Sequence, residues 1–91
     1  MSFIAVVIVV GADQPGIVAR VTTVLAQHMI NIRDISQNYA HEFFTMILVV
    51  EFADESGTLK EVEDEIKEAV QDMGVFISIQ HEDVFRVMHR I

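Results

Sequence analysis

Cysteine is absent from the chain, and proline and glycine are scarce, with one and four residues. Without cysteine there are no disulfides, thiolate metal sites, iron–sulfur clusters or cysteine nucleophiles. The scarcity of proline and glycine, beside 52% apolar residues, excludes a disordered or low-complexity chain. The 91 residues suffice for one small core and are too few for two. We therefore expect a single domain over residues 1–91.

Cations are also few, because six Lys and Arg stand against fourteen Asp and Glu, for a formal net charge of −8. A phosphate backbone is bound by clustered cations, which release its counterions. Here the cations are scattered, so the sequence predicts neither a nucleic-acid nor a membrane partner. Their positions are Arg20, Arg33, Lys60, Lys67, Arg86 and Arg90.

The chain begins with an apolar run from Phe3 to Val10. This run is too short to span a bilayer as a helix. The start also lacks the basic region and the small-residue cleavage site of a signal peptide. These absences predict a cytoplasmic location.

Apolar patterning divides the chain into strands, helices and a tail. Apolar runs and alternation predict strands, and apolar residues spaced by three and four predict helices. The predicted elements are a strand at 3–10, a helix at 17–29, strands at 31–40 and 43–52, a helix at 59–73, a strand at 75–80 and a tail helix at about 82–90.

Several residues are expected to mark helix ends. Pro15 suits the first turn of the first helix, and Asp13 or Gln14 can cap it. Either Ser56 or Thr58 can cap the second helix, and Gly74 is expected to end it. 

The order β-α-β-β-α-β with two right-handed crossovers is typical of the α+β ferredoxin-like sandwich. It predicts a four-stranded antiparallel sheet in the order 4-1-3-2, with both helices on one face and a short C-terminal helix added. The two central strands, 3–10 and 43–52, are apolar on both parities, whereas a strand with a solvated face alternates. We therefore expect the second face to be covered by the tail helix, through Phe85 and Met88, by another subunit, or by both. The alternative is that short apolar strands tolerate exposure.

The loop Gly11–Gly16 precedes the first helix and carries candidate binding groups. Glycine lets a ligand approach the backbone, and a helix start offers free N–H groups to a carboxylate. Asp13 is then placed to receive an ammonium group. The same residues are also explained by a turn and a helix cap alone.

The stretch GADQPGIVARVTTVLAQHMINIRDIS resembles the characteristic segment of ACT domains, which are small ligand-binding regulatory modules. Similarity to the stand-alone ACT proteins covers nearly the whole chain. It extends through Asp34-Ile35-Ser36-Gln37, Phe43-Phe44-Thr45-Met46 and the ending Glu82-Asp83-Val84-Phe85 with Met88-His89-Arg90-Ile91. The matching positions of the first stretch are Gly11, Asp13, Pro15, Gly16, Ile17, Val18, Leu25, Asn31, Ile32 and Asp34.

This resemblance implies a βαββαβ domain that forms a homodimer or larger homo-oligomer and binds an amino acid or similar effector at a subunit interface. In ACT domains the loop after the first strand contacts the ligand, and the start of the second strand, often from the partner subunit, adds further contacts. The tail helix is not part of the generic fold, so the resemblance does not fix which surfaces pair. Carried over, the ligand-binding residues are Gly11, Ala12, Asp13, Gln14, Gly16, Ile17, Asn31 and Ile32.

The favoured function is therefore a non-catalytic regulatory domain that senses an amino acid and acts on metabolism through a partner, with no cofactor. The alternative is an interaction or oligomerisation module without a functional ligand pocket. An acylphosphatase of this fold needs an arginine in the loop 11–16, which has none. An RNA-binding module needs a basic surface around aromatics such as Phe43 and Phe44, which the net charge opposes.

The four histidines predict no metal site, because no two are spaced by four residues as helix ligands would be. His28 lies on the apolar stripe of the first helix and is expected to be partly buried. The identity of the effector stays open between several amino acids and folate-like or purine-like compounds.

Overall fold

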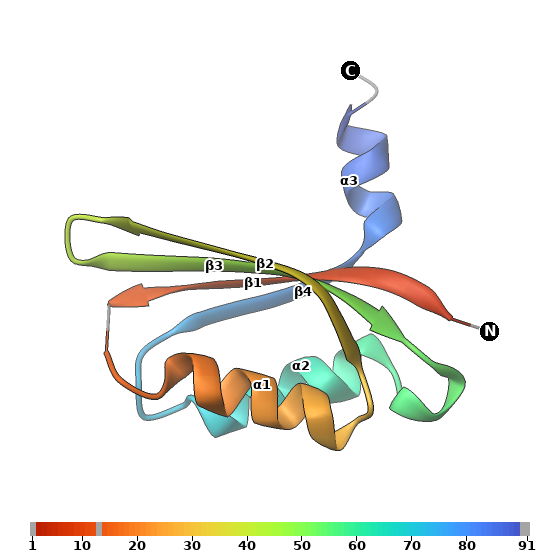
Figure 1. Ribbon diagram of the computed structural model, residues 1–91, viewed down its shortest axis with the longest axis horizontal. Coiled ribbons are helices and arrows are strands. Elements are labelled where there is room, and N and C mark those ends of the chain that lie inside the picture. Colours follow the sequence, from red (N-terminus) through yellow and green to blue (C-terminus); the bar gives the residue numbers. More distant parts are fainter. Residues whose placement is uncertain (1, 13, 90–91) are drawn as a thin grey trace.

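A four-stranded antiparallel sheet with two helices on one face forms the body of the molecule (Figure 1). The computed structural model describes residues 2–12 and 14–89. The elements are β1 (Phe3–Ala12), α1 (Ile17–Gln27), β2 (Asn31–Ala40), β3 (Phe43–Phe52), a 3-10 turn at Asp54–Ser56, α2 (Leu59–Ala69), β4 (Phe76–His81) and α3 (Glu82–His89).

The sheet has the order β2-β3-β1-β4, which confirms the predicted ferredoxin-like topology and the central position of β1 and β3. All three strand pairs are antiparallel, with Val7 opposite both Leu48 and Ile79. The pairing of β2 with β3 shifts between Ile32 and Asp34, where a bulge adds one residue. Strand β2 is an edge strand and is exposed along residues 33–40, as its mixed polarity predicts.

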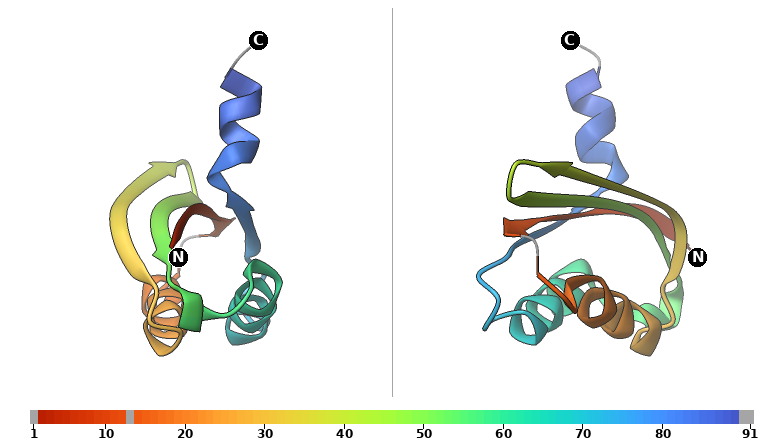
Figure 2. Two further views of the ribbon diagram at one scale, coloured as in Figure 1. Left: turned by 90° about the vertical axis from the view of Figure 1, so that its right-hand side faces the viewer. Right: turned by 60° about the vertical axis from the view of Figure 1, so that its left-hand side comes forward.

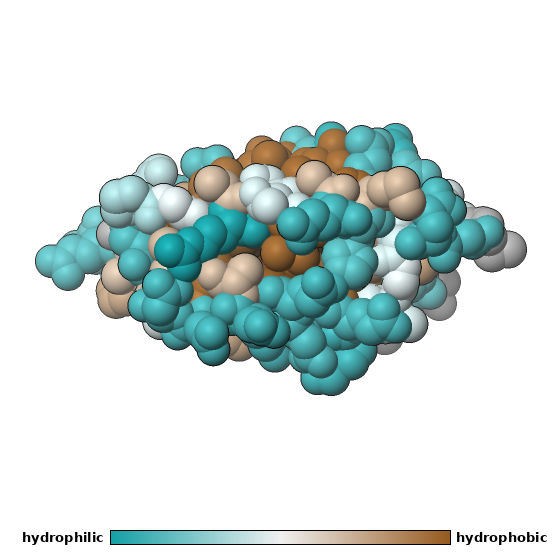
Figure 3. Space-filling model, turned by 90° about the horizontal axis from the view of Figure 1, so that it is seen from below, coloured by the Kyte–Doolittle hydropathy of each residue, from teal (hydrophilic) through white to brown (hydrophobic). Residues whose placement is uncertain are grey.

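The core lies between the sheet and the pair α1 and α2 (Figure 2). One parity of each central strand faces it, and Val7, Leu48 and Met46 are 0% exposed. The helices contribute apolar stripes with spacings of three and four, including Val21 and Ile66. Their outer surfaces are covered mostly by hydrophilic residues (Figure 3).

The start of α1 differs from the expectation. The N-cap is Gly16, in a left-handed conformation with φ 93°, and no side chain bonds to the helix start among the described residues. Pro15 lies in the turn before the cap rather than in the first helical turn. Gln14 does not cap the helix, and its side-chain amide nitrogen donates to the carbonyl of Met73 at 2.8 Å. Asp13 lies outside the described residues.

The end of α2 also differs from the expectation. The helix ends at Ala69, with Val70 as its C-cap, and Gly74 lies four residues later, with φ 64°, just before β4. Thr58 caps the start of α2 as predicted, because its hydroxyl accepts the N–H of Glu61 at 3.1 Å. The other candidate, Ser56, sits in the preceding 3-10 turn, where its hydroxyl accepts the N–H of Ala53. Tight turns after residue 69 therefore replace the last predicted helical turn.

The second face of the sheet carries apolar side chains that no described element covers fully. Phe43 and Phe76 are each 60% exposed and Ile47 is 40% exposed. The register places these side chains on the same face as the half-buried residues Ile8 and Val49. We refer to this surface as the open face, and its apolar members on β1, β3 and β4 are Ile4, Val6, Ile8, Val10, Ala12, Phe43, Ile47, Val49 and Phe76.

The tail helix α3 stands away from the open face rather than lying along it (Figures 1 and 2). Phe85 is half-buried, and the side chain of Met88 lies outside what the structure describes. The tail helix within one chain therefore does not cover the open face. No helix in the described part of the chain is both long and apolar enough to cross a membrane.

Candidate functional site

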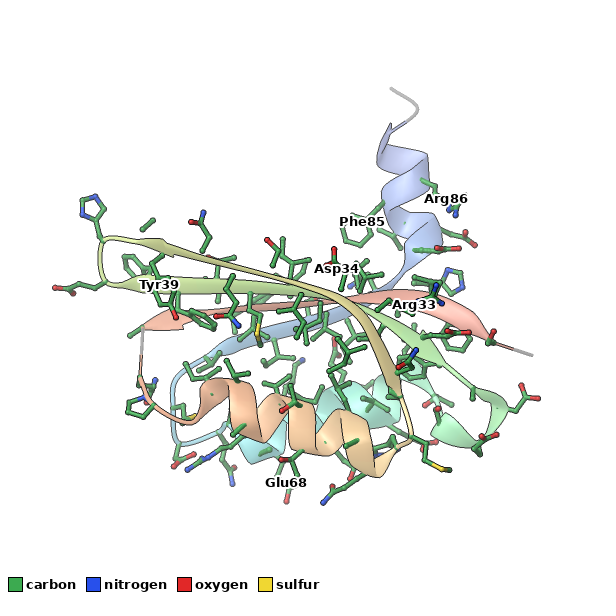
Figure 4. The ribbon with its side chains drawn as sticks, viewed as in Figure 1. Arg33, Asp34, Tyr39, Glu68, Phe85 and Arg86 are labelled. Carbon is green, nitrogen blue, oxygen red and sulfur yellow. The ribbon has the colours of Figure 1, made fainter. Side chains whose placement is uncertain are left out.

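A hollow of about 690 Å³ opens beside the start of α1, on the helix side of the sheet. Its floor is formed by the first turn of α1 and its wall by two aromatic residues, Tyr39 and Phe44. Their rings lie 5.3 Å apart, and Tyr39 extends from the end of β2 toward the helix side (Figure 4). The lining residues are Gln14, Pro15, Gly16, Ile17, Val18, Ala19, Tyr39 and Phe44.

The start of α1 gives this hollow its electrostatic character. The first N–H groups of a helix have no partner within the helix, and they carry a partial positive charge. At α1 the first turn contains no acidic residue. Gly16 is the N-cap, and its φ of 93° is a conformation that L side chains rarely adopt. The backbone amides of this turn are therefore suited to a carboxylate or another anion.

The loop before α1 is held by contacts to the segment between α2 and β4. The Gln14 amide bonds to the Met73 carbonyl, and the Arg20 guanidinium pairs with Asp72 at 2.6 Å and with the Ala69 carbonyl at 3.1 Å. Gly11, at the end of β1, passes close to Val75, since a Cβ atom added there would lie 3.3 Å from the Val75 Cα. These contacts fix the position of the hollow relative to the sheet.

The predicted site residues fall into two groups at opposite ends of the sheet. The residues Gly11, Ala12, Gln14, Gly16 and Ile17 lie around the end of β1 and the start of α1. Their environments differ, because Ile17 is buried whereas Ala12 and Gly16 are exposed. Only Gln14, Gly16 and Ile17 of this predicted group line the hollow.

Asn31 and Ile32 lie at the other end, where β2 begins. Asn31 is opposite Glu51, whereas the far end of β2, at Tyr39, is opposite Phe44 beside the loop. Eight residues of strand separate the two ends of β2, or about 26 Å. Within one chain the structure therefore does not bring Asn31 to the loop.

Asn31 has a contact within its own chain. Glu51 bonds to Arg33 at 2.8 Å, and this hydrogen bond is the main reason why the pKa of Glu51 lies below its usual value. Ser2 and, to a smaller extent, Asn31 also donate to this carboxylate and lower its pKa, while burial opposes them. Asn31 thus helps to hold the start of β2 against β3.

Sequence reasoning missed five lining residues as site residues, namely Pro15, Val18 and Ala19 around the start of α1 and the aromatic pair Tyr39 and Phe44. The signal for the two aromatic residues lies in the strand pairing. A two-residue turn at His41–Glu42 places Tyr39 opposite Phe44, and the pairing of β1 with β3 places Phe43 opposite Ala12. That register brings the end of β2 beside the loop. A pattern search for ligand motifs does not identify an aromatic residue in this position.

A second polar cluster ties the helices together on the same side of the sheet. His28, at the end of α1, contacts the carbonyl of Ser56 through Nδ1 at 2.9 Å and the carboxylate of Glu65 through Nε2. Its side chain is 20% exposed, in agreement with the partly buried histidine that the sequence predicts. No three His, Cys, Asp or Glu residues within 2–12 and 14–89 gather as metal ligands would.

A family model for the ACT domain matches residues 4–80. The chain belongs to the ACT-domain family. Members of this family are generally regulatory, ligand-binding domains. The match includes both groups of predicted site residues and ends before α3, which agrees with a tail helix added to the generic fold.

Relatives of similar length and solved structures support this assignment. A UPF0237 protein of Methanopyrus kandleri is 44% identical over 87 residues, which cover 96% of this chain and 97% of the relative. An ACT domain protein from Streptococcus pneumoniae is 38% identical, with a TM-score of 0.77, and the match covers 91% of this chain and 93% of that one. The ACT domain from the GTP pyrophosphokinase of Chlorobium tepidum is 26% identical, with a TM-score of 0.63 and coverage of 89% and 99%.

Proposed function

We propose that this ACT domain senses an amino acid in the hollow beside the start of α1 and acts, without catalysis, on metabolism through a partner. The observation that carries the proposal is the hollow itself, which joins a helix start that no side chain within 2–12 and 14–89 caps to an aromatic wall. Its volume of about 690 Å³ is within the usual range for a small-molecule site. Its lining combines the two properties that an amino acid requires, namely donors for a carboxylate and apolar surface for a side chain.

In the proposed binding mode the ligand carboxylate accepts hydrogen bonds from the backbone N–H groups of Ile17 and Val18. Its side chain packs against Tyr39 and Phe44, which line the wall. In this proposal Asp13, which comes between Ala12 and Gln14 in the sequence, receives the ammonium group. Gly16 lets the backbone approach the ligand closely, whereas Gly11 packs against Val75 and does not line the hollow.

Asn31 and Ile32 enter this proposal only from a second copy of the chain. β2 is an edge strand, so a two-fold axis can pair two β2 strands in antiparallel register. The start of one β2 then lies beside the end of the other, at the Tyr39 side of the hollow. A side-chain amide such as Asn31 can donate to a carboxylate and accept from an ammonium group.

The direct test is calorimetry of the full chain with each of the twenty amino acids, together with two variants of Asp13. Asp13→Ala removes the charge-assisted contact to the ammonium group, worth about 1.5–3 kcal/mol, or roughly ten- to a hundredfold in affinity. Asp13→Asn keeps a side chain that can cap a helix but loses the charge, so it serves as the control. Affinity lost in both variants with stability unchanged supports the proposal, and affinity unchanged in both leaves Asp13 with a structural role only.

The shared site is tested by mixing chains. Asp13→Ala and Asn31→Ala chains, each defective alone, are expected to restore about one intact site per mixed pair when the site is built from two subunits. The absence of rescue, with subunit exchange confirmed by mass, would contradict a shared site and leave a site formed by the loop alone.

A second candidate function is an interaction module whose ligand pocket is not used. The exposed apolar residues of the open face favour it, because monomeric proteins rarely expose large contiguous apolar patches. No heat change or thermal shift with any of the twenty amino acids, in a chain that assembles normally, favours this candidate over the sensor.

A further inference from the structure

We propose that the open face binds the open face of a second copy, and that α3 of each copy packs against the Phe76 end of the other sheet. This inference concerns a surface separate from the β2 edge through which Asn31 enters the proposed ligand site, and it does not depend on a ligand. It rests on three features of the chain, which are the distribution of charge, the area of the face and the position of α3.

The first feature is the separation of charge from the open face. The exposed acids of α2, including Glu61, Asp64 and Glu68, lie on the helix side, and Glu68 points away from the sheet (Figure 4). Along β1, β3 and β4 the open face holds a single charged residue, Glu51, which is paired with Arg33. Two copies with a net charge of −8 each can therefore meet at this face with their acids turned outward. A strongly charged partner would meet few charged side chains on this face with which to form ion pairs.

The second feature is the arrangement of apolar and polar residues within the face. Ile8 and Ile47 lie opposite each other at its centre. Asp34, Ser36 and Asn38 of β2 form one border, since the register places them on the same face beside Val49, Ile47 and Thr45. Ser78 and Gln80 of β4 form the other border. An apolar centre with a polar rim is the usual anatomy of a protein interface.

The area of the face is close to what a stable dimer needs. Three strands of ten residues, about 33 Å long, and one of six residues, about 20 Å long, spaced by about 4.8 Å, give a flat area of about 570 Å². A standard interface buries about 800 Å² on each partner. The sheet face alone falls somewhat short of this value, and a contribution from α3 makes up the difference.

The third feature is the position of α3 at one end of the face, with exposed aromatics at the other. α3 follows His81, which is opposite Ala5. Phe76 is opposite Val10, five residues further along β1, and Phe43 is opposite Ala12 at the same end. Phe85 projects from α3 on the side that overlooks the sheet, whereas Arg86 projects on the other side (Figure 4).

A two-fold axis that runs between two stacked sheets and across their strands exchanges these ends. It brings α3 of each copy to the end of the other sheet that carries Phe76 and Phe43, so that Phe85 of the second copy meets Phe76. Stacked sheets lie about 10 Å apart, and the eight residues of α3 span about 12 Å. The helix is thus long enough to reach past the edge of the second sheet.

The sharpest test is a disulfide between copies, because the native chain contains no cysteine. A full chain with both Phe76→Cys and Phe85→Cys is expected to form a covalent dimer on mild oxidation, whereas either substitution alone gives little. The two positions lie near opposite ends of β4, about 17 Å of strand apart, so they are out of disulfide reach within one chain. A native-like assembly in which the double variant gives no more covalent dimer than the single variants would overturn the proposal.

The second test measures assembly mass at micromolar concentration by light scattering. Ile47→Asp puts a charge at the centre of the proposed interface, so it is expected to halve the mass and to raise the dissociation constant by at least about 30-fold. Met29→Asp is the control, because Met29 is 62% exposed in the turn after α1 and has φ 56°, which Asp tolerates. A native chain at the monomer mass of 10.3 kDa, or equal masses for the native and Ile47→Asp chains, would overturn the proposal. If the Ile47→Asp chain does not fold, the cysteine test still decides the proposal. Calorimetry with amino acids tests the ligand site separately.

Discussion

The two faces of the sheet carry similar side chains in different surroundings. On the helix side, Val7, Leu48 and Met46 are completely buried by α1 and α2. On the open face, neighbours of the same chemical type alternate with them along the same strands, and Ile47 remains 40% exposed. The comparison separates two uses of apolar residues, because burial within the chain stabilises the fold, whereas exposed apolar surface is available for association.

The largest expected effect on stability comes from substitutions at two neighbouring residues of β3, one on each face of the sheet. Leu48→Ala deletes fully buried atoms and is expected to lower the free energy of unfolding by about 2–5 kcal/mol, at any protein concentration. Ile47→Ala is expected to cost less within one chain, and its cost should grow with protein concentration, because assembly adds stability by mass action. Denaturant unfolding of both variants at several protein concentrations checks this. Equal and concentration-independent losses would remove the distinction between the faces.

Removal of α3 tests whether this helix contributes to association without being needed for folding. A chain that stops after His81 keeps both crossover helices and the complete sheet. It is expected to retain its native circular dichroism spectrum and to associate at least about tenfold more weakly, because a clustered aromatic contact is lost. Sedimentation velocity gives the second quantity. A truncated chain that unfolds would show instead that α3 stabilises the sheet of its own chain.

His28 lies on the helix side, so a substitution there changes the stability of the fold and leaves the open face unaltered. His28→Phe keeps a ring against α2 but removes contacts to the Ser56 carbonyl and the Glu65 carboxylate. The expected loss is about 1–3 kcal/mol of unfolding free energy, from two hydrogen bonds of about 0.5–1.5 kcal/mol each. The dissociation constant of the assembly is expected to stay unchanged. A change in assembly mass would connect the helix side to association and so contradict the comparison.

The smallest effect concerns Glu51, the charged residue that β3 contributes to the open face. Because Arg33 donates to Glu51, the folded-state pKa of this carboxyl is lowered, so its contribution to stability is present above the unfolded-state pKa and is lost as the pH falls through the folded-state value. Arg33→Ala is expected to move the pKa of Glu51 back toward its usual value, which carboxyl carbon NMR titration detects. Lys67→Ala, which removes an ion pair with Glu63 on α2, is the control. An unchanged titration of Glu51 would show that Arg33 does not hold it.

Most of the fold follows from the sequence pattern, because hydrophobic periodicity differs clearly between strands and helices. The strands at 31–40 and 43–52 have the predicted bounds, and the strand order predicted from the order of the elements correctly places β1 and β3 at the centre of the sheet. The ends of the helices were harder to predict. Val70 and Met73 continue the apolar stripe of α2 although the backbone there has left the helix, so periodicity alone extends the helix too far.

The candidate site was predictable only in part. The loop 11–16 carries recognisable residues, but the aromatic wall at Tyr39 depends on the register of a hairpin 25 residues away in the chain. The separation of Asn31 from the loop also depends on how the strands are arranged in the sheet. β1 and β2 run parallel, so that both begin at the same end of the sheet, far from the point where β1 ends. Local sequence does not report such distances.

The central claim is that the open face is covered by a second copy in solution, and two isoleucines test it most directly. Ile35 on the helix side and Ile47 on the open face are 41% and 40% exposed in the single chain. Their methyl signals can be compared by NMR in the presence of a soluble nitroxide, which relaxes protons that solvent reaches. The account predicts that the Ile47 methyl groups are relaxed several-fold less than those of Ile35, and that the difference disappears in the Ile8→Asp chain. Equal relaxation of the two residues in the native chain would show that the open face is free, and would contradict the account.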